Sequence, residues 1–239
     1  MTSFPAIHAR NEPEGEAEVS TEAEIGRARA LAGLYTGAVA DILDELGYRE
    51  QCLPADIRPL KGDMKVAGPV YTVRGRARPA DDGKDPRYVQ MDMLDGIFPG
   101  AVVVIDPGDE TRAAHWGELM SHTAKAKGAA GVVIAGGLRD TSQILELGFP
   151  CFRRYHSPLT AAHRFDITDF GVPIRIGGVL ISPGDHILGD VDGVLAIPAA
   201  VVDQVIERAH SVREREDIVR AALDRGGSIR ELFEQYRVF

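Results

Sequence analysis

A run of small and aliphatic residues ends in two adjacent charges of opposite sign. The stretch GAAGVVIAGGLRD, residues 128–140, delivers Arg139 and Asp140 soon after the glycine pair Gly136 and Gly137. Open α/β folds bind ligands where such strands end, and glycine lets a ligand approach the backbone closely. An isolated Arg–Asp pair is more often a surface salt bridge that contributes little stability. Neighbouring residues therefore decide whether this pair belongs to a site.

Gly117 and Glu118 lie at the predicted start of the helix that leads into this strand. Free N–H groups in the first turn of a helix attract anions. Glu118 and Asp140 are hard oxygen donors for a divalent cation, and Arg139 offers a planar fork to a carboxylate or enolate oxygen. Besides Arg139, the predicted substrate-binding positions are Gly117, Leu119, Met120 and Ser121. Together these groups describe a metal-assisted site for a small oxo-acid.

Other polar residues are weaker candidates. The histidines that could act as a base or a metal ligand are His115, His122, His156, His163 and His186. A single histidine is more often structural or exposed, although His122 follows Glu118 by one helical turn and could face the same side. The loop GDVDG, with Asp190 and Asp192, is typical of a turn.

Helical and strand patterns alternate along the chain. Helices are predicted from Thr21, as the N-cap of a capping box with Glu24, from Thr36 to a glycine cap at Gly47, and over residues 116–127 and 141–148. Strands are predicted at residues 65–77 and 100–108, over 131–140 together with the exit loop, and at 150–155, with hairpins at 172–198. An amphipathic piece is predicted around Met91 to Ile97. A helix or helix pair broken at RGGS follows over residues 199–236. This pattern predicts a single α/β domain with a mixed sheet and flanking helices over residues 21–239, after a flexible arm of residues 1–20.

Composition limits the possible functions. The chain has 239 residues and a formal net charge of −9, with basic residues scattered rather than clustered, so nucleic acid is not an expected partner. The two cysteines, Cys52 and Cys151, lie far apart and predict neither a disulfide framework nor a zinc cluster. No apolar stretch is long enough for a membrane span and no secretory leader pattern is seen, so a cytoplasmic protein is expected.

Four motifs in sequence order resemble the RraA-like family. They are TGAVADILDELGY, WGELMSHTAKAKGAAGVVIAGGLRD, GFPCFRRYHSP and IGGVLISPGDHILGDVDGVLAIP, and they cover roughly residues 30–200. That family includes divalent-metal-dependent pyruvate aldolases for 4-hydroxy-4-methyl-2-oxoglutarate and 4-carboxy-4-hydroxy-2-oxoadipate. The resemblance implies a β/β/α swivelling-domain fold, assembled as homotrimers or homohexamers with the active site at a subunit interface.

The resemblance also implies roles for three residues. Arg139 would bind pyruvate and assist catalysis, Asp140 would hold Mg²⁺ or Mn²⁺, and Glu118 would support the metal and the reaction. Ala135 stands where a common form of the strand motif carries an aspartate, so the surroundings of the site differ here.

The leading hypothesis is a class II aldolase that cleaves a 4-hydroxy-2-oxo acid to pyruvate and a second carbonyl compound. A metal chelated by the substrate would stabilise the enolate, and oxaloacetate decarboxylation is expected as a side activity. No lysine is placed beside the charged pair to form a Schiff base. The alternative is a non-catalytic regulator that binds a ribonuclease or another protein, as some members of the family do.

Overall fold

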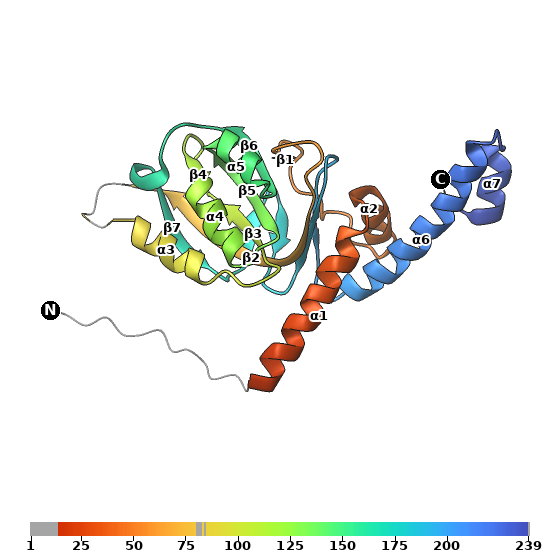
Figure 1. Cartoon of the computed structure of the whole chain (residues 1–239), viewed down its shortest axis with the longest axis horizontal. Helices are drawn as coiled ribbons and strands as arrows, with labels where there is room; N and C mark the ends of the chain where they lie inside the picture. The colour runs from red at the N-terminus through yellow and green to blue at the C-terminus, as the bar shows by residue number, and fades with distance from the viewer. Residues whose placement is uncertain (1–13, 80–82, 84, 239) are drawn as a thin grey trace.

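A curved mixed β-sheet carries the charged pair (Figure 1). The computed structural model describes residues 14–79, 83 and 85–238. The sheet has the order β1 (Arg58–Pro59), β6 (Cys151–His156), β5 (Gly131–Leu138), β3 (Val102–Asp106), β2 (Val66–Ala77), β10 (His186–Gly189) and β11 (Val194–Ile197), with β4 (Ala114–Trp116) paired to β5 and β7 (Phe165–Phe170) paired to β2. The strands β2, β3, β5 and β6 run parallel, whereas β1, β7, β10 and β11 pair antiparallel. The sheet nearly closes into a barrel, and the predicted single α/β domain with a mixed sheet is confirmed.

The central strands are buried on both faces. Along β3, Val102 and Val104 face an inner core that includes the hairpin β8 (Ile174–Ile176) and β9 (Val179–Ile181), while Val103 and Ile105 face a second core under the helices. The strand β5 alternates in the same way. A strand covered on both sides must be apolar throughout, which is why the run before Arg139 reads as continuously hydrophobic.

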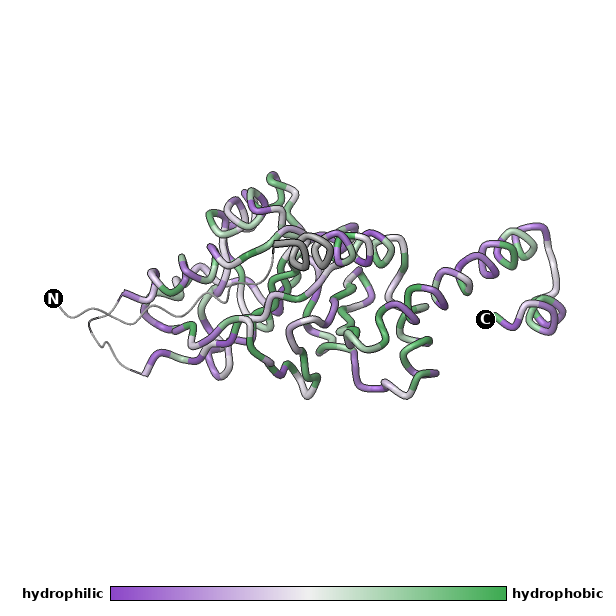
Figure 2. Tube along the Cα trace, turned by 90° about the horizontal axis from the view of Figure 1, so that it is seen from below, coloured by the Kyte–Doolittle hydropathy of each residue, from purple (hydrophilic) through white to green (hydrophobic). Residues whose placement is uncertain are grey.

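Helices cover two regions of this sheet. The second core lies under α3 (Arg87–Asp95), α4 (Glu118–Ala126) and α5 (Thr141–Leu147), and the short helix η1 (Ala161–His163) precedes β7. A third core joins α1 (Glu14–Ala32), α2 (Thr36–Glu45) and α6 (Val202–Leu223) to β10 and β11. Beyond that core, α6 projects away from the sheet and carries α7 (Ile229–Tyr236) at its far end (Figure 1). Polar and apolar residues alternate along this projection (Figure 2), and the predicted break at RGGS separates the two helices.

One predicted helix start is wrong, and a second shifts by two residues to the glutamate that was placed at the helix start. The first helix begins at Glu14 rather than at Thr21, because residues 14–20, EGEAEVS, hold three glutamates and one alanine, which favour helix. Of the predicted arm, residues 1–13 lie outside the described part of the chain and residues 14–20 are helical. The helix predicted from Trp116 begins at Glu118, because Trp116 pairs with Leu138 in β4.

Helix α4 packs a narrow face inward. Ser121 and Ala124 are buried, whereas the side chain of Leu119 is 78 % exposed. Among the described residues, no helix is both long and apolar enough to cross a membrane.

Candidate active site

The backbone at the end of β5 turns sharply and exposes the charged pair. Asp140 has φ 57° and ψ 38°, a left-handed conformation that is uncommon for a residue with a side chain. Its carbonyl accepts the N–H of Ile144 at 3.1 Å and so starts α5, but its carboxylate does not cap that helix. Strained backbone of this kind often marks a functional position.

The Asp140 carboxylate instead joins the two segments that were predicted to form the site. Its Oδ2 accepts the N–H of Glu118 at 3.1 Å and lies 3.4 Å from Nε of Arg139. A Cβ on Gly117 would come within 2.6 Å of the same oxygen, so any larger residue there would displace the Asp140 carboxylate. The φ of Gly117, −154°, is ordinary extended backbone. The start of α4 and the end of β5 are therefore in direct contact, as the sequence predicted.

A cavity of about 410 Å³ opens beside this contact. Its described lining includes Gly117, Glu118, Leu119, Met120, Arg139 and Asp140, together with Arg87 and Gln90 of α3 and residues 160–162. Arg139 and Asp140 also border a second hollow of about 340 Å³ near His156. The side chains of Glu118 and Asp140 are each 37 % exposed and that of Arg139 is 44 % exposed. All three are therefore accessible to a small ligand.

Ser121 was predicted to bind substrate, and this prediction is wrong. Since α4 begins at Glu118, the N–H of Ser121 closes the first helical bond, to the Gly117 carbonyl at 3.1 Å. Its hydroxyl accepts from Trp116 Nε1 at 2.8 Å, and the residue is fully buried. Among the described residues, the N–H groups of Leu119 and Met120 have no acceptor, so these two amides remain available for an anion.

The glycine pair in β5 serves packing rather than ligand approach, contrary to the prediction. A Cβ on Gly136 would come within 2.5 Å of His115 Nδ1, and one on Gly137 within 2.4 Å of the Ala113 carbonyl oxygen and 2.5 Å of Tyr155 Cε2. The space above both glycines is therefore filled by the protein itself.

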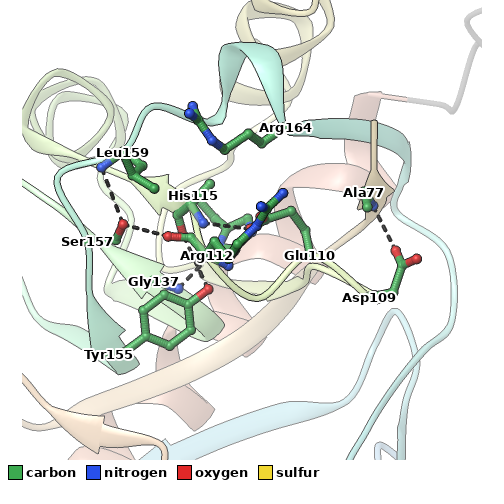
Figure 3. Close-up of polar contacts among 12 residues, drawn as sticks. Ala77, Asp109, Glu110, Arg112, His115, Gly137, Tyr155, Ser157, Leu159 and Arg164 are labelled. Atoms are coloured by element: carbon green, nitrogen blue, oxygen red, sulfur yellow. Dashed lines mark hydrogen bonds and ion pairs between the residues drawn. The ribbon is translucent and has the colours of Figure 1, made fainter. Parts of the chain in front are cut away.

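His115, which lines part of the cavity, belongs to a buried polar cluster (Figure 3). Its Nδ1 accepts the N–H of Gly137 at 3.1 Å, and its Nε2 lies 3.1 Å from Oε2 of Glu110, too poorly aligned for a hydrogen bond. Glu110 also accepts the backbone N–H groups of Arg112 and Ala113. Burial lowers the pKa of His115 to about 4, although Glu110 acts in the opposite direction, so the imidazole is neutral near pH 7. The apolar run AAHW was a signal for the burial of His115, whereas no local pattern marked the burial of Glu110.

The remaining histidines lie at varied distances from the charged pair. His122 Nε2 is 3.8 Å from Glu118 Oε1, so these two side chains share one face of α4 as predicted. His156 contacts Thr141 and Arg153, and its pKa is lowered by burial and, to a smaller extent, by Arg153. His186 is buried against Glu24 of α1 and is not part of the described lining of either hollow, while His163 ends the short helix η1.

The predicted role of Asp190 in a turn is confirmed. Its carboxylate accepts the N–H of Asp192 at 3.0 Å within the turn, and the N–H and hydroxyl of Thr36 at 2.9 and 2.7 Å. The turn between β10 and β11 thereby caps the first turn of α2.

The donor set suits a hydrated hard cation rather than a closed cage of side chains. Glu118 and Asp140 supply carboxylates at one cavity wall, but in the described part of the chain no three His, Cys, Asp or Glu side chains converge. Magnesium is typically held by one or two carboxylates and keeps several waters. Ala135 is buried in the inner core and supplies no further carboxylate. The residues present therefore fit Mg²⁺ or Mn²⁺.

Sequence reasoning missed the part of the cavity lining that comes from α3 and residues 160–162. Arg87 and Gln90 come from a helix that was predicted only as an amphipathic piece around Met91 to Ile97, and Thr160 comes from a loop. The polar side chains on one side of that amphipathic piece were the available signal. Their convergence depends on long-range packing of α3 and β7, which local patterns do not reveal.

Most of this chain is similar to a known protein family. A sequence model of the RraA-like family, described as Aldolase/RraA, matches residues 36–196. A Halalkalibacterium halodurans protein, provisionally named as a 4-hydroxy-4-methyl-2-oxoglutarate aldolase, is 34% identical over 90% of this chain and 97% of its own length. Protein DlpA of Legionella pneumophila is 29% identical over 86% of this chain, which spans only 33% of DlpA.

A solved structure shares the fold. The crystal structure of Streptomyces coelicolor RraAS2, described as an unusual member of the RNase ES inhibitor RraA protein family, has a TM-score of 0.72 and 26% identity. The match covers 89% of this chain and 99% of RraAS2.

Proposed function

Because the chain belongs to the RraA-like family (Aldolase/RraA), we propose that it is a divalent-metal-dependent, class II aldolase that cleaves a 4-hydroxy-2-oxo acid to pyruvate and a second carbonyl compound. The observation that carries the proposal is one guanidinium and two carboxylates at the wall of a single cavity. Arg139, Asp140 and Glu118 come from segments 22 residues apart and meet through the bond from the Glu118 N–H to the Asp140 carboxylate.

The cleavage requires two proton transfers and one bond break. The C4 hydroxyl loses its proton, the C3–C4 bond breaks to leave a carbonyl at C4, and the bonding electron pair forms the enolate of pyruvate, which is then protonated at C3. Arg139 would place its charge beside the developing enolate oxygen. The free N–H groups of Leu119 and Met120 would hold the substrate carboxylate, near the positive end of α4.

Asp140 and Glu118 would hold Mg²⁺ or Mn²⁺. When bound, such a cation withdraws charge from the 2-oxo acid and lowers the energy of the enolate. Among the described residues that line the two hollows there is no lysine, which favours this route over a Schiff base.

Several finer features belong to the same proposal. Oxaloacetate decarboxylation passes through the same pyruvate enolate, so we expect it as a side activity. We also expect a cytoplasmic homotrimer or homohexamer in which a neighbouring subunit borders the exposed cavity. Light scattering after size-exclusion chromatography measures the assembly directly.

The test is pyruvate release from a panel of 4-hydroxy-2-oxo acids and oxaloacetate, with Mg²⁺ or Mn²⁺ and with EDTA. We expect turnover that EDTA abolishes and that Arg139→Ala lowers by about 100- to 1,000-fold, the size of losing one charge-stabilising donor. Arg139→Lys retains the charge without the planar fork and should fall between the two. Arg230→Ala, on the exposed helix α7, is the matched control and should equal the parent.

The alternative function is distinguished by the same panel. A folded protein that releases no pyruvate with either metal contradicts the aldolase proposal and favours a non-catalytic regulator. The similarity to RraAS2 then makes inhibition of a ribonuclease the next assay.

A further inference from the structure

The ladder of β5 is interrupted just before the charged pair. The register between β5 and β6 shifts between Ile134 and Gly137, and the register between β4 and β5 shifts at His115, between Ala114 and Trp116. At such a bulge a backbone group loses its usual partner on the neighbouring strand. The bulge stands two residues before Arg139, so its geometry sets the direction in which that side chain leaves the sheet.

A side chain replaces the missing backbone acceptor. His115 Nδ1 accepts the N–H of Gly137 at 3.1 Å, and the next bond along the chain runs from the N–H of Arg139 to the Trp116 carbonyl at 3.1 Å. The imidazole fits because Gly136 has no Cβ. The consecutive residues His115 and Trp116 therefore hold the backbone of residues 137–139.

The surroundings of His115 fix which nitrogen carries the proton. Since Nδ1 accepts, the proton of the neutral ring is on Nε2, which faces Glu110 Oε2 at 3.1 Å. The Phe165 ring packs edge-on against the imidazole, with 4.7 Å between the ring centroids. Glu110 and His115 are only 3 % and 2 % exposed. Burial of a carboxylate costs free energy of folding unless the group is paired or hydrogen-bonded.

We propose that His115 is a positioning residue of the candidate active site: it holds Gly137 and thereby sets the place of Arg139, while the charge of Glu110 beside Nε2 favours the tautomer that carries its proton there. This inference rests on the proposed function for its catalytic consequence, but its structural part does not. His115 contributes to the lining of the cavity, but its side chain is fully buried, so the proposed role is to position Arg139 rather than to contact substrate or metal.

Two substitutions separate the hydrogen bond from the general packing of the site. His115→Asn keeps an acceptor near the position of Nδ1, whereas His115→Leu removes it at similar volume. His210→Leu, on α6 away from the cavity, is the matched control for exchanging a histidine for leucine. Each variant is made in the full chain and is first checked for folding by thermal unfolding.

The first readout is hydrogen exchange of the peptide that contains Gly137 and Arg139. We expect faster exchange in His115→Leu than in the parent, and restored protection in His115→Asn. Unchanged protection in a folded His115→Leu overturns the proposal, whether or not the protein is an aldolase.

The second readout is the affinity for oxalate, a planar analogue of the pyruvate enolate, with Mn²⁺ present, measured together with kcat and KM. We expect His115→Leu to weaken oxalate binding by roughly 10- to 100-fold, the loss typical of a misplaced binding group, and to change it by less than about 2-fold in an Arg139→Ala background. Equal losses in the two backgrounds mean that His115 acts only on general stability, which overturns the positioning role. Absence of pyruvate release by the parent refutes the proposed function alone, because exchange and oxalate affinity still report on His115.

Discussion

Replacement of Gly117 by alanine is the sharpest perturbation of the site. The added methyl would lie 2.6 Å from Asp140 Oδ2 and 3.3 Å from both Cγ and Nε of Arg139. Ordinary contacts begin near 3.4 Å, so the carboxylate must move by about 0.8 Å, since 3.4 − 2.6 = 0.8. That movement takes the carboxylate away from the Glu118 N–H.

The expected effect on activity is large and the effect on stability is small. A displacement approaching 1 Å costs up to about 100-fold in rate, or about 2.7 kcal/mol. The backbone of Gly117 is extended, so alanine adds no strain there and even lowers the entropy of the unfolded chain, worth about 0.4 to 1 kcal/mol. The melting temperature of Gly117→Ala should therefore stay within a few degrees of the parent.

The assay combines Mn²⁺ affinity by isothermal titration calorimetry, metal-dependent pyruvate release and thermal unfolding. Gly62→Ala is the matched control, because a Cβ at Gly62 meets no atom within 4 Å. If Gly117→Ala retains Mn²⁺ affinity and pyruvate release within about 2-fold of the parent, then the position of the Asp140 carboxylate does not govern the site and the reasoning is refuted.

Two further predictions concern stability. The pKa of His115 falls from 6.5 to about 4 on folding, because burial disfavours the imidazolium more than the facing Glu110 favours it. The unfolded chain therefore takes up this proton first as the pH falls, so the free energy of unfolding should decrease between about pH 6.5 and pH 4; urea denaturation should show a smaller decrease for His115→Asn. Asp190→Ala removes the acceptor of Thr36 and Asp192 and should cost about 2 to 3 kcal/mol in urea denaturation, whereas Asp192→Ala, at an exposed side chain, should stay within about 0.5 kcal/mol.

Local patterns in the sequence predicted most of the elements that build the site. The strand β5 was recognisable because burial on both faces leaves an uninterrupted apolar run, and α2 ends at its predicted glycine because Gly47 adopts φ 87°. The placing of Glu118 near Arg139 and Asp140 was also predictable, since a helix that feeds a parallel strand begins at the same edge of the sheet at which the strand ends.

Features that depend on side-chain packing were not predictable. No glycine in the sequence marks the left-handed backbone at Asp140. Whether an amide in α4 is free to bind an anion depends on the helix start to within one residue, and the observed start at Glu118 leaves the N–H of Ser121 bonded within the helix. Glu110 lies in a stretch with several charged residues that reads as a surface loop. Its burial arises from the turn that wraps its own carboxylate with backbone N–H groups.

The close fit between His115 and Gly136 has a consequence for how related sequences can diverge. Any side chain at position 136 collides with the imidazole, and loss of the imidazole leaves both a void and an unpaired amide at Gly137. Neither position can change first without a cost, so the two residues should be inherited together or replaced together. Descendants that abandon this pair would need a new way to brace the strand end, and such lineages are where a different chemistry would be expected to arise on the same scaffold.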